Sequence, residues 1–439
     1  MRSLFLISFL SLFINQLSYA NETMLLRLHG SNTIGVKLGP ELVKSWLLSE
    51  GYKDIKSHQL KDEERVISAI NKFGDKKLVQ IYSHGSSSAF TALKKGAADI
   101  GMSSRPIKGL EKNMLGNFGD MTRAATEYVI GLDGVAVIVS KKNSIQQLTQ
   151  KTIKKIFTGE ITHWKQINKK YKGKIQVYAR NNKSGTYDTF KSLVLGSHLP
   201  LIKSAKRYVS NDKLSNDVAK DLLGIGFIGL PYINDSKALA IVEKGIAPKP
   251  PQSFDVATED YALSRRLYMY APNMESNKNI QSFIEYSLSI IGQNVVEKSG
   301  FISQNPHSQM VELHPDFPKE YLDFTHKSER LSMNFRFQKG TTSLDNKAMR
   351  DIKRLVDYIA KPENKSKKVM LFGFSESSEA MPVFALDLSI YRVDWVSTLL
   401  SKNGIDSIRV RGYGDVIPVA SNENSGGRHK NRRVEVWVQ

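Results

Sequence analysis

Residues 129–139 read Val-Ile-Gly-Leu-Asp-Gly-Val-Ala-Val-Ile-Val, an apolar run rich in β-branched side chains that only Asp133 and two glycines interrupt. This composition is typical of a β-strand. On either side of the run, from Met24 to about Ile302, short β-rich segments alternate with helical patterns. The alternation predicts an α/β domain whose strands are largely parallel.

The neighbouring elements of this domain follow from the same patterns. Further strands are expected at residues 25–28, 174–178 and 225–230. Amphipathic helices are expected at residues 38–49, 90–95, 152–157 and 280–291. Residues 303–328 contain three prolines and no sustained period, so we interpret them as a linker that follows a first domain of residues 21–302.

After the linker the pattern begins again in a second unit, residues 329–439. Its strands are expected at residues 331–337, 369–374, 408–412 and 433–438. Its two long helices are expected at residues 344–360 and 384–401. The order β-α-β-α-β-β predicts a small α/β sandwich as the C-terminal domain.

The chain has 439 residues, no cysteine and a formal net charge of +20. The lack of cysteine excludes a disulfide scaffold, cysteine-ligated zinc, iron–sulfur clusters and a thiol nucleophile. A basic chain can bind nucleic acid, but the N-terminus argues for export. Met1-Arg2-Ser3 starts the chain with a positive charge, residues 4–14 are mostly apolar, and Ser18-Tyr19-Ala20 supplies small residues. We therefore expect residues 1–20 to be a cleaved signal peptide, with no transmembrane segment after it and no nucleic-acid partner.

Three junctions of the first domain place small polar residues between a β-rich run and a helical pattern. They are Gly30-Ser31-Asn32-Thr33, Gly85-Ser86-Ser87-Ser88 and Ser184-Gly185-Thr186, and Arg180 lies four residues before the third. Backbone N–H groups at helix N-termini, hydroxyl donors and glycine favour a small oxyanion, and an arginine adds charged donors. Each junction on its own is more often only an N-cap.

A further segment, Ala97-Ala98-Asp99-Ile100-Gly101-Met102-Ser103-Ser104-Arg105-Pro106, resembles a stretch of the periplasmic phosphate-binding proteins. These proteins are the solute receptors of ATP-driven phosphate importers. The resemblance extends, in the family's order, over about residues 24–302. Its other pieces are residues 30–35, 134–139, 156–164, 180–186, 226–232, 267–270 and 300–301. The resemblance implies two α/β lobes that are joined by a hinge and close on inorganic phosphate.

The resemblance also implies which residues bind the anion. They are Ser31, Thr33, Ser86, Arg180, Ser184, Gly185 and Thr186. One position departs from the family, because Ser104 stands where many members have an aspartate that accepts a proton from phosphate. A serine can donate as well as accept a hydrogen bond, so we include Ser104 in the phosphate-binding set and expect weaker rejection of sulfate or arsenate.

The second domain resembles the peptidoglycan-binding domain that is shared by the C-terminal half of OmpA and by the Pal lipoprotein. The matching pieces are residues 335–337, 371–376, 388–392, 412–414, 418–420, 427–428 and 431–435. The resemblance assigns Glu376 and Arg392 to the ammonium and carboxylate of diaminopimelate in a wall peptide. A surface or interdomain ion pair is the alternative. The family usually has aspartate at Glu376 and a loop one residue shorter before the arginine, which argues for weakened wall binding.

No Gly-x-Ser-x-Gly, His-Glu-x-x-His or Walker pattern occurs, and the nine histidines are scattered. We therefore expect no enzyme, no metal and no cofactor. We predict a receptor that captures inorganic phosphate for an ABC-type permease in the periplasm of a Gram-negative bacterium, with its C-terminal domain tethered to peptidoglycan or the outer membrane. The alternative is a structural or interaction protein of the wall or outer membrane with a vestigial cleft. A phosphate-releasing hydrolase is the weakest interpretation.

Overall fold

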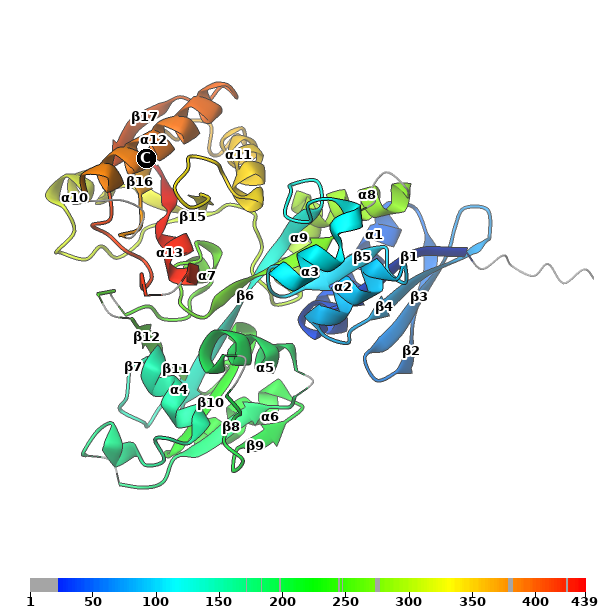
Figure 1. Cartoon of the computed structure of the whole chain (residues 1–439), viewed down its shortest axis with the longest axis horizontal. Coiled ribbons are helices and arrows are strands. Elements are labelled where there is room, and N and C mark those ends of the chain that lie inside the picture. The colour runs from blue at the N-terminus through cyan, green and yellow to red at the C-terminus, as the bar shows by residue number, and fades with distance from the viewer. Residues whose placement is uncertain are drawn as a thin grey trace, which may run out of the picture.

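The structure is a computed structural model that describes residues 23–439 except 171, 183, 197–198, 244, 247, 273–276, 378–381 and 424. The expected signal peptide, residues 1–20, lies outside the described residues. Within the described part of the chain, no helix combines the length and the apolar composition that crossing a membrane requires. Figure 1 shows two lobes and a C-terminal domain arranged around one long strand, β6 (Glu127–Val139).

Lobe one is built from both ends of the first domain. Its strands are β1 (Thr23–Gly30), β2 (Lys53–Lys61), β3 (Glu64–Ile70), β4 (Lys76–Tyr82), β5 (Ile100–Ser103) and β13 (Ser264–Tyr270). Its helices are α1 (Gly39–Ser49), α2 (Ser86–Lys94), α3 (Gly109–Met114), α8 (Lys278–Leu288) and α9 (Ile290–Lys298).

Lobe two is built from the middle of the first domain. Its strands are β7 (Gln147–Thr149), β8 (Gln176–Arg180), β9 (Lys206–Tyr208), β10 (Gly224–Gly229), β11 (Lys237–Ala238) and β12 (Ala240–Val242). Its helices are α4 (Gln150–Thr158), α5 (Gly185–Phe190), α6 (Asn211–Lys220) and α7 (Ser253–Ala257).

Strand β6 joins the two lobes in one sheet. Its first part pairs antiparallel with β13, and its second part, from Val135 onward, pairs antiparallel with β10. The order across the sheet is β2-β3-β4-β1-β5-β13-β6-β10-β8-β9, and β11 also pairs with β6. Inside the lobes, β1 is parallel to β4 and β5, and β8 is parallel to β9 and β10. The predicted α/β class is confirmed, with a sheet that is mixed rather than largely parallel.

The apolar run of residues 129–139 forms the buried core of this sheet. Within residues 129–139, Asp133 is the one side chain that is not fully buried. Helices pack on both faces of the sheet, so both sides of the strand need apolar residues. In lobe two the core is an aromatic stack in which the rings of Phe190 and Phe227 lie 4.0 Å apart. Lobe one packs α1, α8 and α9 around Trp46 and Phe283.

The C-terminal domain is a five-stranded sheet with the order β14-β15-β18-β16-β17. Its strands are β14 (Ser308–Gln309), β15 (Glu329–Arg336), β16 (Val369–Phe374), β17 (Ser407–Gly412) and β18 (Arg433–Val438). Its helices are α10 (Lys319–Thr325), α11 (Asn346–Ile359), α12 (Pro382–Ser401) and α13 (Ser425–Asn431). The predicted β-α-β-α-β-β order is present, with the short helix α13 inserted before the last strand.

Residues 303–328, which we interpreted as a linker, are folded onto the C-terminal domain. Strand β14 pairs with β15, and α10 covers the face of the sheet opposite α11 and α12. Tyr321 of α10 is 2% exposed and donates a 2.7 Å hydrogen bond to Glu435. A helix of seven residues after Pro318 is too short to leave a helical period in the sequence, which explains the different expectation.

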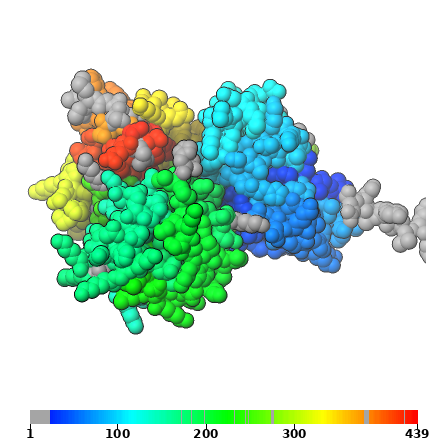
Figure 2. Space-filling model, turned by 60° about the horizontal axis from the view of Figure 1, so that its bottom comes forward, coloured from blue at the N-terminus to red at the C-terminus, as the bar shows by residue number. Residues whose placement is uncertain are grey.

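The C-terminal domain docks against both lobes near β6. Helix α11 lies beside the start of β6, where Asn346 donates a 2.8 Å hydrogen bond to the Thr122 carbonyl of lobe one. On the other lobe, the Ser421 N–H donates to Glu243 at 3.1 Å. Figure 2 shows the red end of the chain lying against the green surface of lobe two. The C-terminal domain is therefore packed onto the first domain rather than held away from it.

Candidate functional site

The first two predicted loops meet at the edge of the sheet in lobe one. Because β1 is parallel to both β4 and β5, the carboxyl ends of the three strands lie side by side. The Ser31 N–H donates to the Met102 carbonyl at 2.8 Å, and the Gly85 N–H donates to the Gly30 carbonyl at 2.8 Å. These bonds fix the Gly30–Thr33 loop against both the Gly85–Ser88 loop and the end of β5.

Three buried serines lie in this group of loops. The Ser86 and Ser104 hydroxyl oxygens are 3.1 Å apart, and the Ser104 N–H donates to the Ser86 hydroxyl at 3.1 Å. Ser31 is 0% exposed, and its hydroxyl has no hydrogen-bond partner within the described part of the chain. Buried polar atoms are nearly always hydrogen-bonded, so an unpaired hydroxyl here fits a site that a ligand completes.

The third loop reaches this group from lobe two. Ser184 is buried at the N-cap of α5, and Gly185 and Thr186 form the first turn of that helix. A Cβ atom on Gly185 would overlap the hydroxyl oxygen and Cα of Thr33, so only glycine permits this approach. The structure therefore brings the predicted hydroxyl-bearing loops of both lobes into contact.

Arg180 is placed differently from the other predicted residues. It ends β8, and its guanidinium donates to the carbonyls of Tyr208 and Val209, at 3.4 and 2.8 Å, and to the side chain of Asn211. Tyr208 ends β9, Val209 follows it and Asn211 begins α6, and β9 lies beside β8 in the sheet. Burial lowers the pKa of the Arg180 guanidinium. In this structure Arg180 lies beside the third loop without joining its hydroxyls.

The arginine that does reach the loops is Arg265, which the sequence analysis did not identify. It lies on β13, is 9% exposed, and donates to the Thr33 hydroxyl at 2.6 Å and to the Gly185 carbonyl at 3.0 Å. Its Nε lies 3.3 Å from a carboxylate oxygen of Asp133. Burial raises the pKa of Asp133, and the neighbouring Arg265 opposes that shift. The one charged residue inside the apolar run 129–139 was the available signal, because a buried carboxylate requires a partner.

The predicted wall-binding residues are both fully buried. Arg392 on α12 donates to the Thr341 carbonyl at 3.1 Å, and its guanidinium lies 5.2 Å from the Phe337 ring centre. Glu376 follows β16, and its carboxylate lies 3.6 Å from the guanidinium of Arg432. Arg432 also donates to the Phe337 carbonyl at 3.2 Å and was not among the predicted site residues. Its position before β18, in the Asn-Arg-Arg run, was the available signal.

Among the described residues, no group of three or more histidine, aspartate or glutamate side chains is arranged to hold a metal ion. The polar side chains of the loops that meet between the lobes are hydroxyls and the guanidinium of Arg265, which is paired with Asp133. Such a set is suited to hold an anion by hydrogen bonds.

Comparison with known proteins finds a family match for each of the two domains. The PBP superfamily domain matches residues 66–290, just over half of the chain, and the OmpA family matches residues 336–432. The phosphate-binding protein PstS of Staphylococcus epidermidis is 30% identical over 254 residues, which are 56% of this chain and 75% of that protein. PstS of Staphylococcus aureus is 29% identical over 296 residues, 64% of this chain and 88% of its own length.

A solved structure shows the same fold for the first domain. The crystal structure of an ABC-type phosphate transport receptor from Vibrio cholerae aligns with a TM-score of 0.50 and 22% identity, covering 63% of this chain and 99% of that one. The two-lobed architecture, the converging loops and these matches agree with one another. The chain therefore belongs to the PBP superfamily of solute-binding proteins, which are not enzymes, and consists of a PstS-like domain followed by an OmpA-family domain.

Proposed function

We propose that this protein is a periplasmic receptor that captures inorganic phosphate, or a related tetrahedral oxyanion, for an ABC-type permease. Its OmpA-family domain would hold it on the peptidoglycan of a Gram-negative cell, at the wall or the outer membrane. The PstS relatives, at about 30% identity, support the ligand class. The OmpA-family match supports association with peptidoglycan.

The observation that carries the proposal is the meeting of the three loops at one place: the first and second are hydrogen-bonded together, the third approaches Thr33 at Gly185, and the fully buried hydroxyl of Ser31 has no partner among the described residues. We assign Ser31, Thr33, Ser86, Ser104, Arg180, Ser184, Gly185 and Thr186 to the anion. Each hydrogen bond to a charged group contributes about 1.5–3 kcal/mol. A handful of such bonds therefore reaches the roughly 8 kcal/mol that micromolar binding requires.

Arg180 remains in the proposed set because it lies on the strand that leads into the third loop. Two of its hydrogen bonds go to backbone carbonyls, at Tyr208 and Val209. An anion offers a guanidinium a charged acceptor, which forms a stronger hydrogen bond than a neutral carbonyl does. We propose that Arg180 exchanges these carbonyls for the anion when it binds.

Selectivity for phosphate over sulfate would depend on the pair formed by Ser86 and Ser104. Either hydroxyl can be the donor in their 3.1 Å contact, so the pair can offer a donor or an acceptor to the anion. A carboxylate at Ser104 would accept only, and would reject a fully ionised sulfate. We propose that sulfate and arsenate compete with phosphate here more strongly than in relatives that carry the aspartate.

The wall pocket would use Glu376, Arg392 and Arg432. Diaminopimelate offers an ammonium and a carboxylate on one side chain, which a carboxylate beside Arg432 and the second guanidinium of Arg392 would complement. All three side chains are at least nine-tenths buried, so their interaction with a charged peptide would be screened little by salt. A tether of this kind raises the local concentration of the receptor without changing its intrinsic affinity.

The test is isothermal titration calorimetry of the mature chain with phosphate, sulfate and arsenate. We expect micromolar or tighter phosphate binding, which Ser31→Ala and Arg180→Ala each weaken by at least tenfold, about 1.4 kcal/mol. Ser57→Ala, on the exposed edge strand β2, is the matched control and should bind like the wild type. The absence of heat and of a thermal shift with all three anions would defeat the proposed ligand class.

One observation favours a second candidate, a wall or outer-membrane protein whose cleft is vestigial. The guanidinium of Arg180 is held by β9 and α6 rather than by the loops. In that case purified sacculi should retain the protein while the calorimetry shows no anion binding. Retention of the protein together with phosphate binding would support the tethered receptor instead.

A further inference from the structure

Strand β13 carries two consecutive arginines whose side chains reach two different parts of the molecule. Neighbouring residues of a strand project to opposite faces of the sheet. Arg265 extends to the cleft, where it contacts Thr33 of lobe one and Gly185 of lobe two. Arg266 extends to the C-terminal domain, where it lies 2.8 Å from the carboxylate of Asp345. One strand therefore touches the anion loops and the C-terminal domain at adjacent positions.

This strand lies where the chain crosses between the lobes. The chain crosses once within β6, near residues 133–135, and again just before β13, at Leu263 and Ser264. The two crossings are joined by a hydrogen bond of 3.1 Å from the Val135 N–H to the Leu263 carbonyl. Any rotation of one lobe relative to the other must change the backbone here. The Arg265 contacts to both lobes form only when Thr33 and Gly185 are together, so β13 is sensitive to closure.

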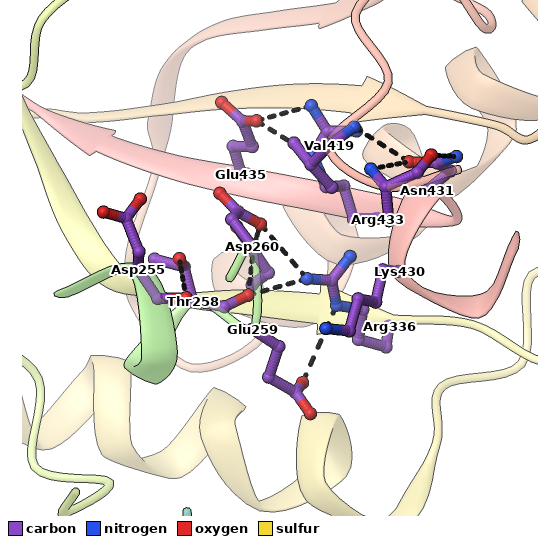
Figure 3. Close-up of polar contacts among 12 residues, drawn as sticks. Asp255, Thr258, Glu259, Asp260, Arg336, Val419, Lys430, Asn431, Arg433 and Glu435 are labelled. Atoms are coloured by element: carbon purple, nitrogen blue, oxygen red, sulfur yellow. Dashed lines mark hydrogen bonds and ion pairs between the residues drawn. The ribbon is translucent and has the colours of Figure 1, made fainter. Parts of the chain in front are cut away.

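The contact between β13 and the C-terminal domain is buried and charged. Figure 3 shows Glu259 and Asp260, which precede β13, facing side chains from β15 and β18. The Arg336 guanidinium donates to the Thr258 carbonyl at 2.6 Å, and Arg330 lies 2.9 Å from the Asp260 carboxylate. Since a buried charge that loses its partner is strongly destabilising, these pairs hold the C-terminal domain in one position relative to the hinge.

The charges at this contact reinforce one another. Arg266 is bound by the carboxylates of both Glu259 and Asp345, at 2.6 and 2.8 Å. Burial alone would raise the pKa of Glu259, but Arg266 and then Arg336 outweigh it and lower that pKa to about 2. Arg266 is thus shared between the receptor domain and the C-terminal domain. Removing the Asp345 charge would leave Glu259 as its remaining close carboxylate among the described residues.

Asp345 is also connected to the proposed wall pocket. The loop of residues 337–345 begins with the Phe337 carbonyl, which accepts from Arg432, and includes the Thr341 carbonyl, which accepts from Arg392. It ends at Asp345, whose N–H donates to the Arg336 carbonyl at 2.9 Å and whose side chain caps α11. One short loop therefore contacts the arginines of the proposed wall pocket along its length, and its last residue, Asp345, pairs with Arg266 of β13.

We infer that the OmpA-family domain regulates the anion cleft through β13, so that a wall peptide in its pocket and an anion between the lobes change each other's affinity. The inference rests on the proposed function for the identity of the two ligands. The bound wall peptide would order the 337–345 loop, Asp345 would hold Arg266, and Arg265 would stay on Thr33 and Gly185. Linkage makes the coupling reciprocal, with typical factors of about 5–150.

The first experiment removes the link without removing a helix cap. Asn at position 345 still caps α11 but lacks the charge that holds Arg266, so Asp345→Asn in the full chain should weaken phosphate binding about fivefold or more. Asp357→Asn is the matched control, because Asp357 lies on the same helix and pairs with Lys353 in solvent. A phosphate Kd in Asp345→Asn within twofold of that in Asp357→Asn would overturn the inference.

The second experiment measures the linkage directly. Phosphate titrations of the wild type, with and without a saturating diaminopimelate-containing muropeptide, should differ by about fivefold or more, and phosphate should tighten muropeptide binding by the same factor. The factor should fall toward one in Asp345→Asn. An unchanged factor in that variant, or no effect in the wild type, would overturn the inference.

A ligand-free measurement separates failure of the coupling from failure of the proposed function. If no anion gives heat, the proposed ligand is wrong, yet deuterium uptake can still be compared in residues 30–35 and 184–190. Faster uptake in Asp345→Asn than in Asp357→Asn would support the link between the C-terminal domain and the cleft. Identical uptake in the two variants would overturn it.

Discussion

The proposed anion site and the junction between the two domains differ in the polar groups that they bury. Apart from the ion pair of Arg265 and Asp133, the loops of this site gather neutral hydroxyls, one of which, on Ser31, has no partner among the described residues. The junction buries charged side chains that pair with residues of opposite charge, as in the 2.9 Å contact between Arg330 and Asp260. The difference is one of charge: the proposed binding site leaves a neutral hydroxyl for a ligand to complete, whereas ion pairs between opposite charges fix the geometry of the junction.

The two regions should therefore fail in different ways when they are mutated. An unpaired buried hydroxyl costs about 1–3 kcal/mol, which a ligand can recover on binding. An unpaired buried charge costs about 3–5 kcal/mol. Substitutions in the cleft should change affinity with little change in stability, and substitutions at the junction should change stability first.

The largest expected effect is at Asp260, which is 1% exposed and lies close to both Arg330 and Arg336. Asp260→Ala leaves two buried guanidinium groups without this partner, so the free energy of unfolding should fall by about 3–5 kcal/mol. Urea denaturation of the full chain measures it. Asp357→Ala, at an exposed ion pair on α11, is the control and should change stability by about 0.5 kcal/mol or less. An Asp260→Ala loss below about 1 kcal/mol would contradict the role given to the junction.

The second largest effect is expected in the proposed wall pocket, where buried charged side chains would also bind the wall peptide. Glu376→Ala removes the carboxylate that lies 3.6 Å from Arg432. Truncating one member of a buried charged pair in an interface costs about 2–5 kcal/mol, so retention on purified sacculi should fall by more than tenfold. Glu423→Ala, on an exposed loop, serves as the control.

Salt separates the two explanations for retention on sacculi. If retention is unchanged in Glu376→Ala but disappears at high salt, the net charge of +20 binds the wall and the pocket does not. If the variant loses retention at moderate salt while its unfolding curve matches that of the control, the pocket is used.

Gly185 tests whether the approach of the two lobes matters for binding. A methyl group at this position would collide with Thr33, and it would separate the third loop from the first. Gly185→Ala should weaken phosphate binding about tenfold or more, about 1.4 kcal/mol, with an unfolding midpoint close to the wild type. Gly109→Ala is the control, because a Cβ there meets nothing within 4 Å. Equal phosphate affinity in both variants would show that closure does not need this contact.

The sequence predicted elements and loops that have a local sequence pattern, and it missed contacts between residues that are far apart in the chain. The strand at residues 129–139, the two long C-terminal helices and the hydroxyl loops all carry local signals, and all are present. Arg265 carries none, because its role arises only when β13 returns beside β6 after more than a hundred residues. The contact of the Arg180 guanidinium with the end of β9 was missed for the same reason. Helix α10 was missed because seven residues are too few for a periodic signal.

The smallest expected effect is the pH dependence that Lys430 gives the junction. Its ammonium donates to the Tyr261 carbonyl at 2.7 Å and to the Ser264 hydroxyl at 3.0 Å, at the start of β13. Burial lowers the pKa of Lys430 to about 8, although Glu259 opposes the shift. The ordinary value for lysine is about 10.4.

Between pH 8 and about 10.4 the unfolded chain therefore holds a proton on this lysine that the folded chain has released, so stability rises with pH in that window. Below pH 8 Lys430 is charged in both states, and its contribution no longer changes with pH. Lys430→Met lacks the group, so the wild type should gain on the order of 1 kcal/mol relative to the variant between pH 7.5 and 10, since part of the side chain stays in solvent. Urea denaturation at the two pH values measures this difference. Parallel pH profiles for the two proteins would show that Lys430 is not buried at the junction, and would weaken the case that the C-terminal domain is docked on β13 in solution.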